Sequence, residues 1–404
     1  MEDALDAAPQ TDASSPDARD PAAACSIKTG HAGIVSVLHD PDGAVRATVQ
    51  TGANGLASWD DCPANALVSY AKYSADDGWK GVTVAGLQPG DHVEVMRESS
   101  DLVTTGKVAI PNDAADVVMI RAWAGGVCSA NTGEGATASI SVTENCRGED
   151  GTKLPVLAIG NIGGVAVYAH SLGASIVAGG DTPVTDMSGW MTGPQLSVSA
   201  TNVFSNQMQF EVQPMWNGRS YGGLSQLVNA SDNAASANLS LPPSAFSGVR
   251  RVGVSTSGLA RRGIVRTTTA YDAMFDMGFL LPEISALTVD ETTAGRPAYA
   301  VVGALTSTDL GIIHTGWMNN GVAVSWRLIY PSATTSTITF PALPEDLAGA
   351  TPTSAMTSYA AAVDVTGSTY AQVLARGYRF GEFMNSCPEV PAGSECWFST
   401  RSFP

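Results

Sequence analysis

Short runs in which apolar and polar residues alternate occupy most of the chain after residue 30. Examples are GIVSVLH (33–39), DHVEVMR (91–97), QLSVSATNVF (195–204) and AVSWRLIYP (323–331). Clusters of Gly, Pro, Asn and Asp separate the runs, a spacing typical of antiparallel β-sandwiches. No apolar period of 3.6 residues persists beyond about ten residues, although LPEDLAGA (343–350) suits one helical turn. The pattern predicts an all-β fold of two to three antiparallel β-sandwich modules in tandem.

Composition agrees with short strands and many turns. Charged residues make up 15% of the 404 residues, and 42 residues are glycine, whereas long helices need many Glu, Lys, Leu and Arg side chains. Residues 1–26 differ, because Ala, Pro, Ser and acids dominate them and cannot bury enough apolar surface to fold. We expect a disordered acidic tether at 1–26, then domains at 27–99, 100–215 and 216–404, each with one disulfide.

The turns of the 27–99 region follow a recognisable order. A tight turn at Asp40-Pro41-Asp42-Gly43 links two strands, Asn54-Gly55 suits a hairpin turn with positive φ, and Pro89-Gly90-Asp91 precedes a closing strand. This order resembles the carboxypeptidase regulatory-like, or transthyretin-like, β-sandwich of secreted bacterial proteins, although Gly52 stands where that family often has Asp. The resemblance implies a structural or adhesive accessory module without catalysis.

The third region adds a second, coarser likeness. The layout of residues 216–404, with Trp317, Trp326 and a terminal cysteine pair, resembles secreted, lipoprotein-type bacterial proteins. That resemblance implies an architecture and no activity.

Charge and hydropathy exclude several partners. The net charge of −17 argues against general nucleic-acid binding, which depends on Lys and Arg. No apolar run is long enough for a transmembrane helix. The sequence starts without a signal pattern, so we expect an export signal or a lipid tether upstream of the given residues. AAAC at 22–25 resembles the end of a lipobox, but no apolar stretch precedes it.

Six cysteines indicate an oxidising compartment. Their clustering along the chain predicts three local disulfides, and the absence of C-x-x-C motifs and of nearby histidines argues against zinc. We therefore expect an extracytoplasmic protein, secreted or on a bacterial surface. The expected pairs are Cys25–Cys62, Cys128–Cys146 and Cys387–Cys396.

The stretch AHSLG (169–173) is close to the G-x-S-x-G nucleophile elbow of serine hydrolases. Ser171 would be the nucleophile, His314 is the only later histidine, and Asp290 is the acid that position favours. A hydrolase also needs alternating strands and helices, with a long helix after the serine. Because about two helical turns separate Ser171 from a breaking Gly-Gly-Asp at 179–181, the context favours a small-residue strand.

Two further groups of residues are candidates for binding. One basic cluster, folded as a hairpin about STSG (255–258), would cradle an anionic glycan or headgroup, or would form a solvated face paired with carboxylates. Trp79 is the best candidate for an exposed, sugar-stacking ring, whereas Trp59, Trp123 and Trp326 suit apolar cores. The cluster comprises Arg250, Arg251, Arg261, Arg262 and Arg266.

Metal binding is a weaker expectation. The five histidines are scattered without zinc spacing. Acids at two turns could hold calcium, although turn formation alone explains them. These acids are Asp40, Asp42, Asp76 and Asp77.

The sequence thus favours a non-catalytic exported or cell-surface protein with a binding, adhesive or structural role, whose partner is a cell-surface protein or a glycan. Two alternatives stay open: a serine hydrolase using Ser171 and His314, and a calcium-dependent glycan-binding protein.

Overall fold

The computed structural model describes most of the chain outside the first residues. The described residues are 24–29, 31–94, 102–109, 116–125, 128–131, 137–143, 155–172, 183–184, 187–216, 219–243, 248–303, 308–332, 337–354, 357–375, 387 and 393–403. They fold almost entirely into β-strands, which confirms the all-β prediction. Of the predicted tether, residues 1–23 lie outside this range. The first strand, β1 (Cys25–Lys28), already includes residues 25 and 26.

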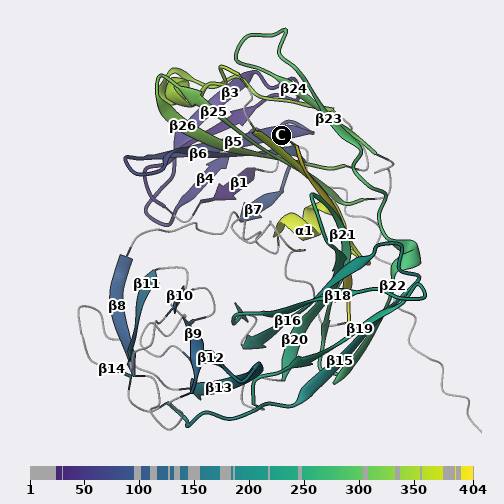
Figure 1. The fold of residues 1–404 in the computed structure, drawn as a ribbon. Coiled ribbons are helices and arrows are strands. Elements are labelled where there is room, and N and C mark those ends of the chain that lie inside the picture. The colour runs from purple at the N-terminus through teal and green to yellow at the C-terminus, as the bar shows by residue number, and fades with distance from the viewer. Residues whose placement is uncertain are drawn as a thin grey trace, which may run out of the picture.

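One long sheet of 13 strands dominates the fold. In spatial order its strands are β17 (Arg219–Ser220), β16 (Gln207–Trp216), β20 (Val249–Thr256), β21 (Ala260–Thr268), β29 (Glu395–Phe403), β28 (Thr357–Val365), β25 (Leu310–Asn319), β26 (Val322–Tyr330), β6 (Gly78–Leu87), β5 (Ala66–Ser74), β2 (Val35–His39) and β3 (Val45–Gln50), with β18 (Leu224–Asn229) also paired to β16. The sheet bends, and α1 (Tyr370–Ala375) lies inside the bend (Figure 1). We call the side facing α1 the concave face.

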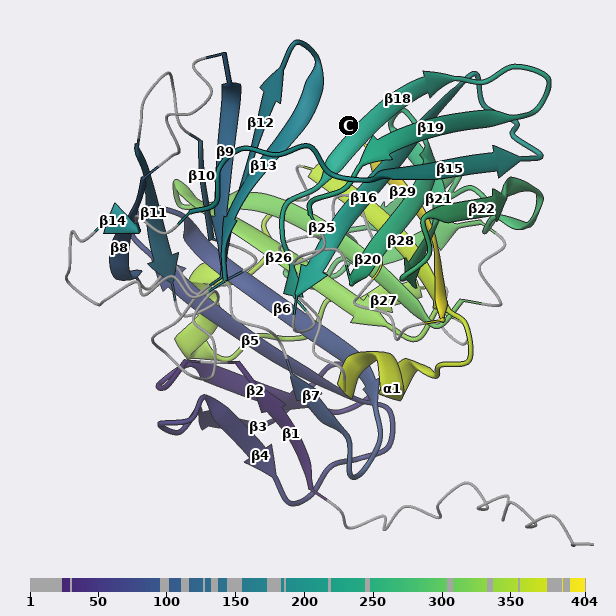
Figure 2. The same ribbon diagram turned by 90° about the horizontal axis from the view of Figure 1, so that it is seen from below.

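Three small sheets pack on the long sheet, and a separate pair of sheets lies beside it (Figures 1 and 2). The small sheets are β4 (Leu56–Trp59)–β1–β7 (His92–Glu94), β19 (Ala235–Ser240)–β15 (Gln195–Thr201)–β22 (Asp272–Asp276) and β23 (Ala286–Asp290)–β24 (Ala298–Val302)–β27 (Thr337–Thr339). The separate pair comprises β10 (Cys128–Asn131)–β9 (Val118–Ala124)–β12 (Val156–Ile162)–β13 (Val165–Ser171) and β11 (Thr137–Thr143)–β8 (Leu102–Ala109)–β14 (Pro183–Val184).

Each packed pair of sheets encloses apolar side chains, as a β-sandwich requires. Strands of the long sheet turn one set of alternate residues towards the β19–β15–β22 and β23–β24–β27 sheets. Their other alternate residues meet the β4–β1–β7 sheet and α1 on the concave face. The separate pair of sheets has an apolar core of its own. It contacts the rest of the fold where the hydroxyl of Tyr168 on β13 donates a hydrogen bond to the Ser240 carbonyl of β19 at 2.7 Å.

The long sheet runs through regions that are far apart in the sequence. Strand β6 of the N-terminal region pairs in parallel with β26, for example Val82 with Arg327. Strand β16, which begins before residue 215, pairs with β20 beyond it. The ends predicted for domains at residues 99 and 215 therefore do not mark the ends of separate sheets, and the division into three domains stays a prediction.

A buried polar network joins four neighbouring strands of the long sheet at this junction. His39 Nε2 lies 2.9 Å from Ser69 Oγ, which lies 2.8 Å from Thr83 Oγ1, and the Trp326 indole donates to Thr83 at 3.0 Å. All four side chains are buried. Because buried polar groups are costly without partners, the network fixes β2, β5, β6 and β26 in one register.

Several local predictions are confirmed and others need correction. Gly43 (φ 81°) closes the turn at 40–43, and residues 345–350 form the 3-10 helix η3 (Glu345–Ala350). The turn at Asn54-Gly55 is present, but it joins β3 and β4, which lie in different sheets, so it is not a hairpin. Sequence spacing did not predict α1 or the 3-10 helix η2 (Met277–Phe279).

The disulfide predictions are confirmed where both cysteines are described. Cys25 bonds to Cys62, and Cys387 bonds to Cys396. Cys128 is also disulfide-bonded, whereas Cys146 lies outside the described residues, so that pairing stays a prediction. None of the described helices is long and apolar enough to cross a membrane.

Candidate binding face

The three residues of the hydrolase alternative lie in three different sheets. Ser171 is the buried last residue of β13, which pairs antiparallel with β12, and its Oγ has no hydrogen-bond partner among the residues that the structure describes. His314 Nε2 lies 2.8 Å from Ser325 Oγ on the neighbouring β26. Asp290 ends β23 and accepts a bond from the Thr292 amide at 3.0 Å. Strand β13 is far from β25 (Figure 1), so the structure does not assemble a triad. The strand interpretation of residues 167–175 is confirmed up to Ser171, and residues 173–175 lie outside the described residues.

The acids considered for calcium serve as turn and ion-pair residues. Asp40 pairs with Arg46 at 2.8 Å, and Asp42 accepts a bond from the Ala44 amide at 2.9 Å. Asp77 pairs with Lys80 at 3.0 Å, and Asp76 is an exposed residue of the same β5–β6 turn. Among the described residues, no three His, Cys, Asp or Glu side chains gather as metal ligands would.

Strands β20 and β21 form the predicted arginine hairpin, but its arginines divide between two faces. Arg250 pairs with Thr268 and Val252 with Arg266, and side chains alternate along each strand. Arg251 and Arg261 therefore face the concave side. The other three point towards the β19–β15–β22 sheet, so the structure does not gather the five arginines into one cradle. They do not form one solvated face either, because Arg250 and Arg251 are buried.

The three arginines on that second side each stack on an aromatic ring. The guanidinium carbons of Arg250, Arg262 and Arg266 lie 4.5, 4.1 and 5.2 Å from the ring centres of Tyr271, Phe204 and Phe275, respectively. Arg266 is also paired with Glu395 of β29. Burial lowers the pKa of Arg250. These cations stabilise the sandwich through cation–π contacts and do not form an open site.

The tryptophans mostly fill cores, as predicted. Trp59, Trp123 and Trp326 are buried. Trp79 is half-buried against the core shared with β23–β24–β27, with the Tyr73 ring centre at 5.4 Å. Because Trp79 alternates with Lys80 along β6, its ring lies on the side away from the concave face.

A band of polar side chains crosses the concave face. Strand register aligns Tyr70 of β5, Arg327 of β26, His314 of β25 and Tyr359 of β28 in one row, with Val82 of β6 between the first two. The adjacent row begins with Lys72 and Lys80, which are directly opposite each other. Arg261 continues the band on β21. We call this set the polar band: Tyr70, Lys72, Lys80, Arg327, His314, Tyr359 and Arg261.

Side chains of the polar band are partly accessible. Lys80 is exposed and the other members are of intermediate burial. Arg261 donates to Gln209 Oε1 at 3.1 Å and to Ser255 Oγ at 2.9 Å. Burial lowers the pKa of Arg261, although Glu211 opposes that effect, and burial raises the pKa of Tyr359.

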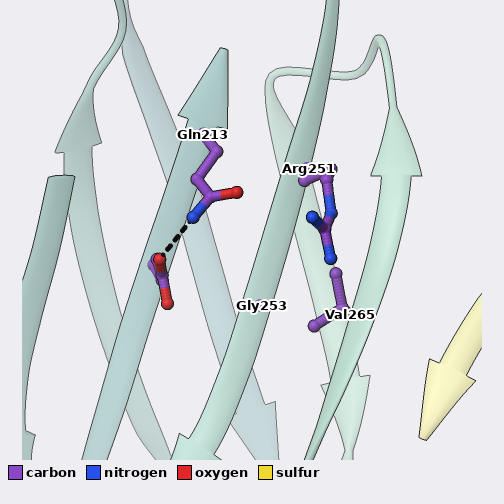
Figure 3. Close-up of a pocket in the computed structure, with 5 residues that line it drawn as sticks. Gln213, Arg251, Gly253 and Val265 are labelled. Carbon is purple, nitrogen blue, oxygen red and sulfur yellow. Dashed lines mark hydrogen bonds between the residues drawn. The ribbon is translucent and has the colours of Figure 1, made fainter. Parts of the chain in front are cut away.

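A pocket lies beyond Arg261 on the same face (Figure 3). It is a small, half-open hollow lined by Glu211 and Gln213 of β16, Arg251 and Gly253 of β20, and Val265 of β21. Gln213 Nε2 donates to Glu211 Oε1 at 2.8 Å, and the Arg251 guanidinium donates to the Cys387 carbonyl. The pocket therefore presents a carboxylate, an amide and a guanidinium around a glycine that leaves room for a small group.

Sequence reasoning missed most of the polar band. Lys72, Lys80, Tyr359 and Arg327 are scattered over nearly 290 positions, and no spacing rule connects them. His314 and Arg261 were singled out for other reasons. The one available signal was polar residues at alternate positions of apolar strands, such as Ser325 and Arg327 in AVSWRLIYP.

Comparisons with known proteins give no family. No protein-family model matches the chain, and no curated protein matches it. Solved structures that align with it include the FN1–FN3 domains of chicken CNTN1, with 9% identity over 66% of this chain and 91% of that chain, and a TM-score of 0.16.

Two other solved structures align at a similar level. The tetra-tandem repeat in the extending region of a large adhesion protein shares 11% identity over 84% of this chain and 94% of that chain, with a TM-score of 0.14. A structure on Dscam isoform specificity shares 11% identity over 81% and 87%, with a TM-score of 0.13. TM-scores this low carry no argument, so fold and site rest on the geometry described above.

Proposed function

We propose that this chain is a non-catalytic, exported or cell-surface binding protein that holds its ligand on the concave face of the long sheet. The polar band is the observation that carries this proposal. Its side chains come from strands of both the N-terminal and the C-terminal regions, yet register places them in contiguous rows. A band of partly accessible Arg, Lys, His and Tyr side chains beside a pocket is typical of a recognition surface.

Export is part of the same proposal. Two disulfides within the described residues support an oxidising compartment. Within residues 25–94, the β4–β1–β7 sheet packs on β2, β5 and β6 of the long sheet, a two-layer arrangement that supports an accessory module of the carboxypeptidase regulatory-like kind at 27–99. An adhesive or structural role would use the concave face as the contact surface.

Binding to arrays of immobilised polysaccharides and extracellular proteins tests the role of the concave face. Gly253→Leu fills the pocket, because a Cβ there already lies 3.3 Å from Val265, and Arg327→Glu reverses a charge of the polar band. Gly248→Leu is the matched control, because a Cβ at Gly248 meets nothing within 4 Å. We expect the first two variants, and not the control, to weaken binding at least about tenfold. Equal binding by all variants, or no binding by the wild type, would contradict the proposal.

Fluorophosphonate labelling separates this function from the hydrolase alternative. Because Ser171 is buried at the end of a strand and lies in a different sheet from His314, we expect no labelling at Ser171. Stoichiometric labelling that disappears in Ser171→Ala would instead make the protein a serine hydrolase.

A further inference from the structure

The charge of the concave face is opposite to that of the whole chain. The net charge is −17, yet the strands of the long sheet turn mainly cations towards this side. By register and alternation, Lys72, Lys80 and Arg327 lie on one half and Arg261 and Arg251 on the other. Among the described residues, the carboxylates beside these cations are Glu211, at the pocket, and Asp77 of the β5–β6 turn, which pairs with Lys80.

We propose that the polar band binds an acidic polysaccharide, laid across the strands from β5 to β21. This inference rests on the proposed function and adds the class of ligand. Six strand-to-strand steps separate β5 from β21 in the sheet order, and neighbouring strands lie about 4.8 Å apart. The band therefore offers a track of about 30 Å, long enough for several sugar residues.

The side chains between the cations favour a sugar polymer over an acidic peptide. Tyr70 and Tyr359 are partly buried rings with hydroxyl groups, which suits stacking on sugar faces with simultaneous hydrogen bonding. A chain of uronic acids offers carboxylates to the cations and flat C–H faces to the tyrosine rings in the same repeating unit, whereas an acidic peptide carries carboxylates without such ring faces.

The two arginines define where carboxylates of the ligand bind. A planar guanidinium can bind a carboxylate through two parallel hydrogen bonds, whereas a lysine ammonium acts as a point charge. Arg327 and Arg261 occupy different parts of the track, separated by β25, β28 and β29. Glu211 repels a further acidic sugar beyond Arg261 and so ends the anionic track at the pocket.

Titration calorimetry with polygalacturonate tests the proposal on the full chain. Neutral dextran and poly-glutamate are the comparison probes. We expect binding of polygalacturonate that weakens at least about tenfold when the salt concentration is raised about fourfold. Arg261→Gln with Arg327→Gln should weaken it by at least about tenfold. The matched control, Arg46→Gln with Arg121→Gln, removes equal charge outside the band and should bind as the wild type does.

Each of the other outcomes contradicts a specific part of the proposal. If poly-glutamate binds as tightly as polygalacturonate, the polar band is a general polyanion-binding surface, and the proposal of a polysaccharide ligand is wrong. Equal loss in the control pair would assign binding to net charge and overturn the band. If polygalacturonate does not bind while concave-face variants still lose array binding, the ligand class is wrong and the proposed function stands. If those variants also bind the arrays as the wild type does, both the ligand class and the proposed function are wrong.

Discussion

His39 is a fully buried histidine at the end of β2. Burial lowers its pKa from 6.5 to about 4, with Arg296 adding to the effect, so the folded protein keeps the imidazole neutral at pH values where the unfolded chain takes up a proton. A histidine with a lowered folded pKa contributes stability that is lost as the pH falls below 6.5 towards 4.

Replacing His39 by glutamine should remove this acid sensitivity. Between pH 7 and pH 4.5 the wild-type free energy of unfolding should fall by about 2 kcal/mol more than that of His39→Gln. Urea unfolding of both proteins at the two pH values measures this difference. The other titrating groups are the same in the two proteins, so their contributions cancel. An equal fall in both proteins would show that His39 is not protonated on unfolding.

Gly81 allows Trp326 to lie flat against β6. A Cβ at position 81 would sit 2.1 Å from Cε3 of the indole, and the bond from Trp326 to Thr83 prevents the ring from moving away freely. We expect Gly81→Ala to lower the free energy of unfolding by more than about 2 kcal/mol, as overpacked cores do. Gly248→Ala, with nothing within 4 Å, should change it by less than about 0.5 kcal/mol, and a similar effect of both would contradict this packing argument.

At the scale of elements, β22 is a short edge strand with protective charges. It pairs only with β15 among the described strands, and its sequence DAMFD places acids at both ends of exposed Met274. In an antiparallel pair of two β22 strands, Asp272 of one copy would face Asp276 of the other. Such like charges oppose edge-to-edge association.

Removing one acid should therefore promote self-association. Asp272→Thr keeps a good strand former at the edge, and sedimentation velocity should show a larger dimer fraction than in the wild type. Asp116→Thr, with the same charge change in an exposed turn, is the control. If the two variants sediment alike, β22 is not the edge that the acids protect.

Local elements of this fold were predictable, and their long-range pairing was not. The β20–β21 hairpin follows from a glycine-containing turn between two alternating runs, so its existence was expected from residues 249–268 alone. The faces of its arginines depend on which sheet covers which side, and no local pattern carries that information. In the same way, Arg327 lies in the same row as Tyr70 only because β26 pairs with β6, which is more than 230 residues earlier in the sequence. For this reason the polar band could not be predicted from the sequence.

At the scale of the molecule, the N-terminal strands depend on the C-terminal ones. Without β26, strand β6 has an open edge, and Leu67, Ala71 and Ala85 lose the core that they share with Trp326. We expect the isolated fragment 24–99 to show no cooperative urea unfolding by circular dichroism. The fragment 102–190, whose two sheets enclose their own core, should unfold cooperatively. Cooperative unfolding of monomeric 24–99 would instead support a separate domain there.

The position of β29 sets an order of events during synthesis. Residues 395–403 come after every other strand in the sequence, yet they pair on both sides in the middle of the long sheet, between β21 and β28. Until these residues leave the ribosome, the two halves of the sheet have no common strand to join them. The sheet therefore closes only after residues 395–403 have been made, and contacts of such long sequence separation form slowly. Until these residues pair, the edges of β21 and β28 are open to other chains, so incomplete chains of this protein are exposed to edge-to-edge association.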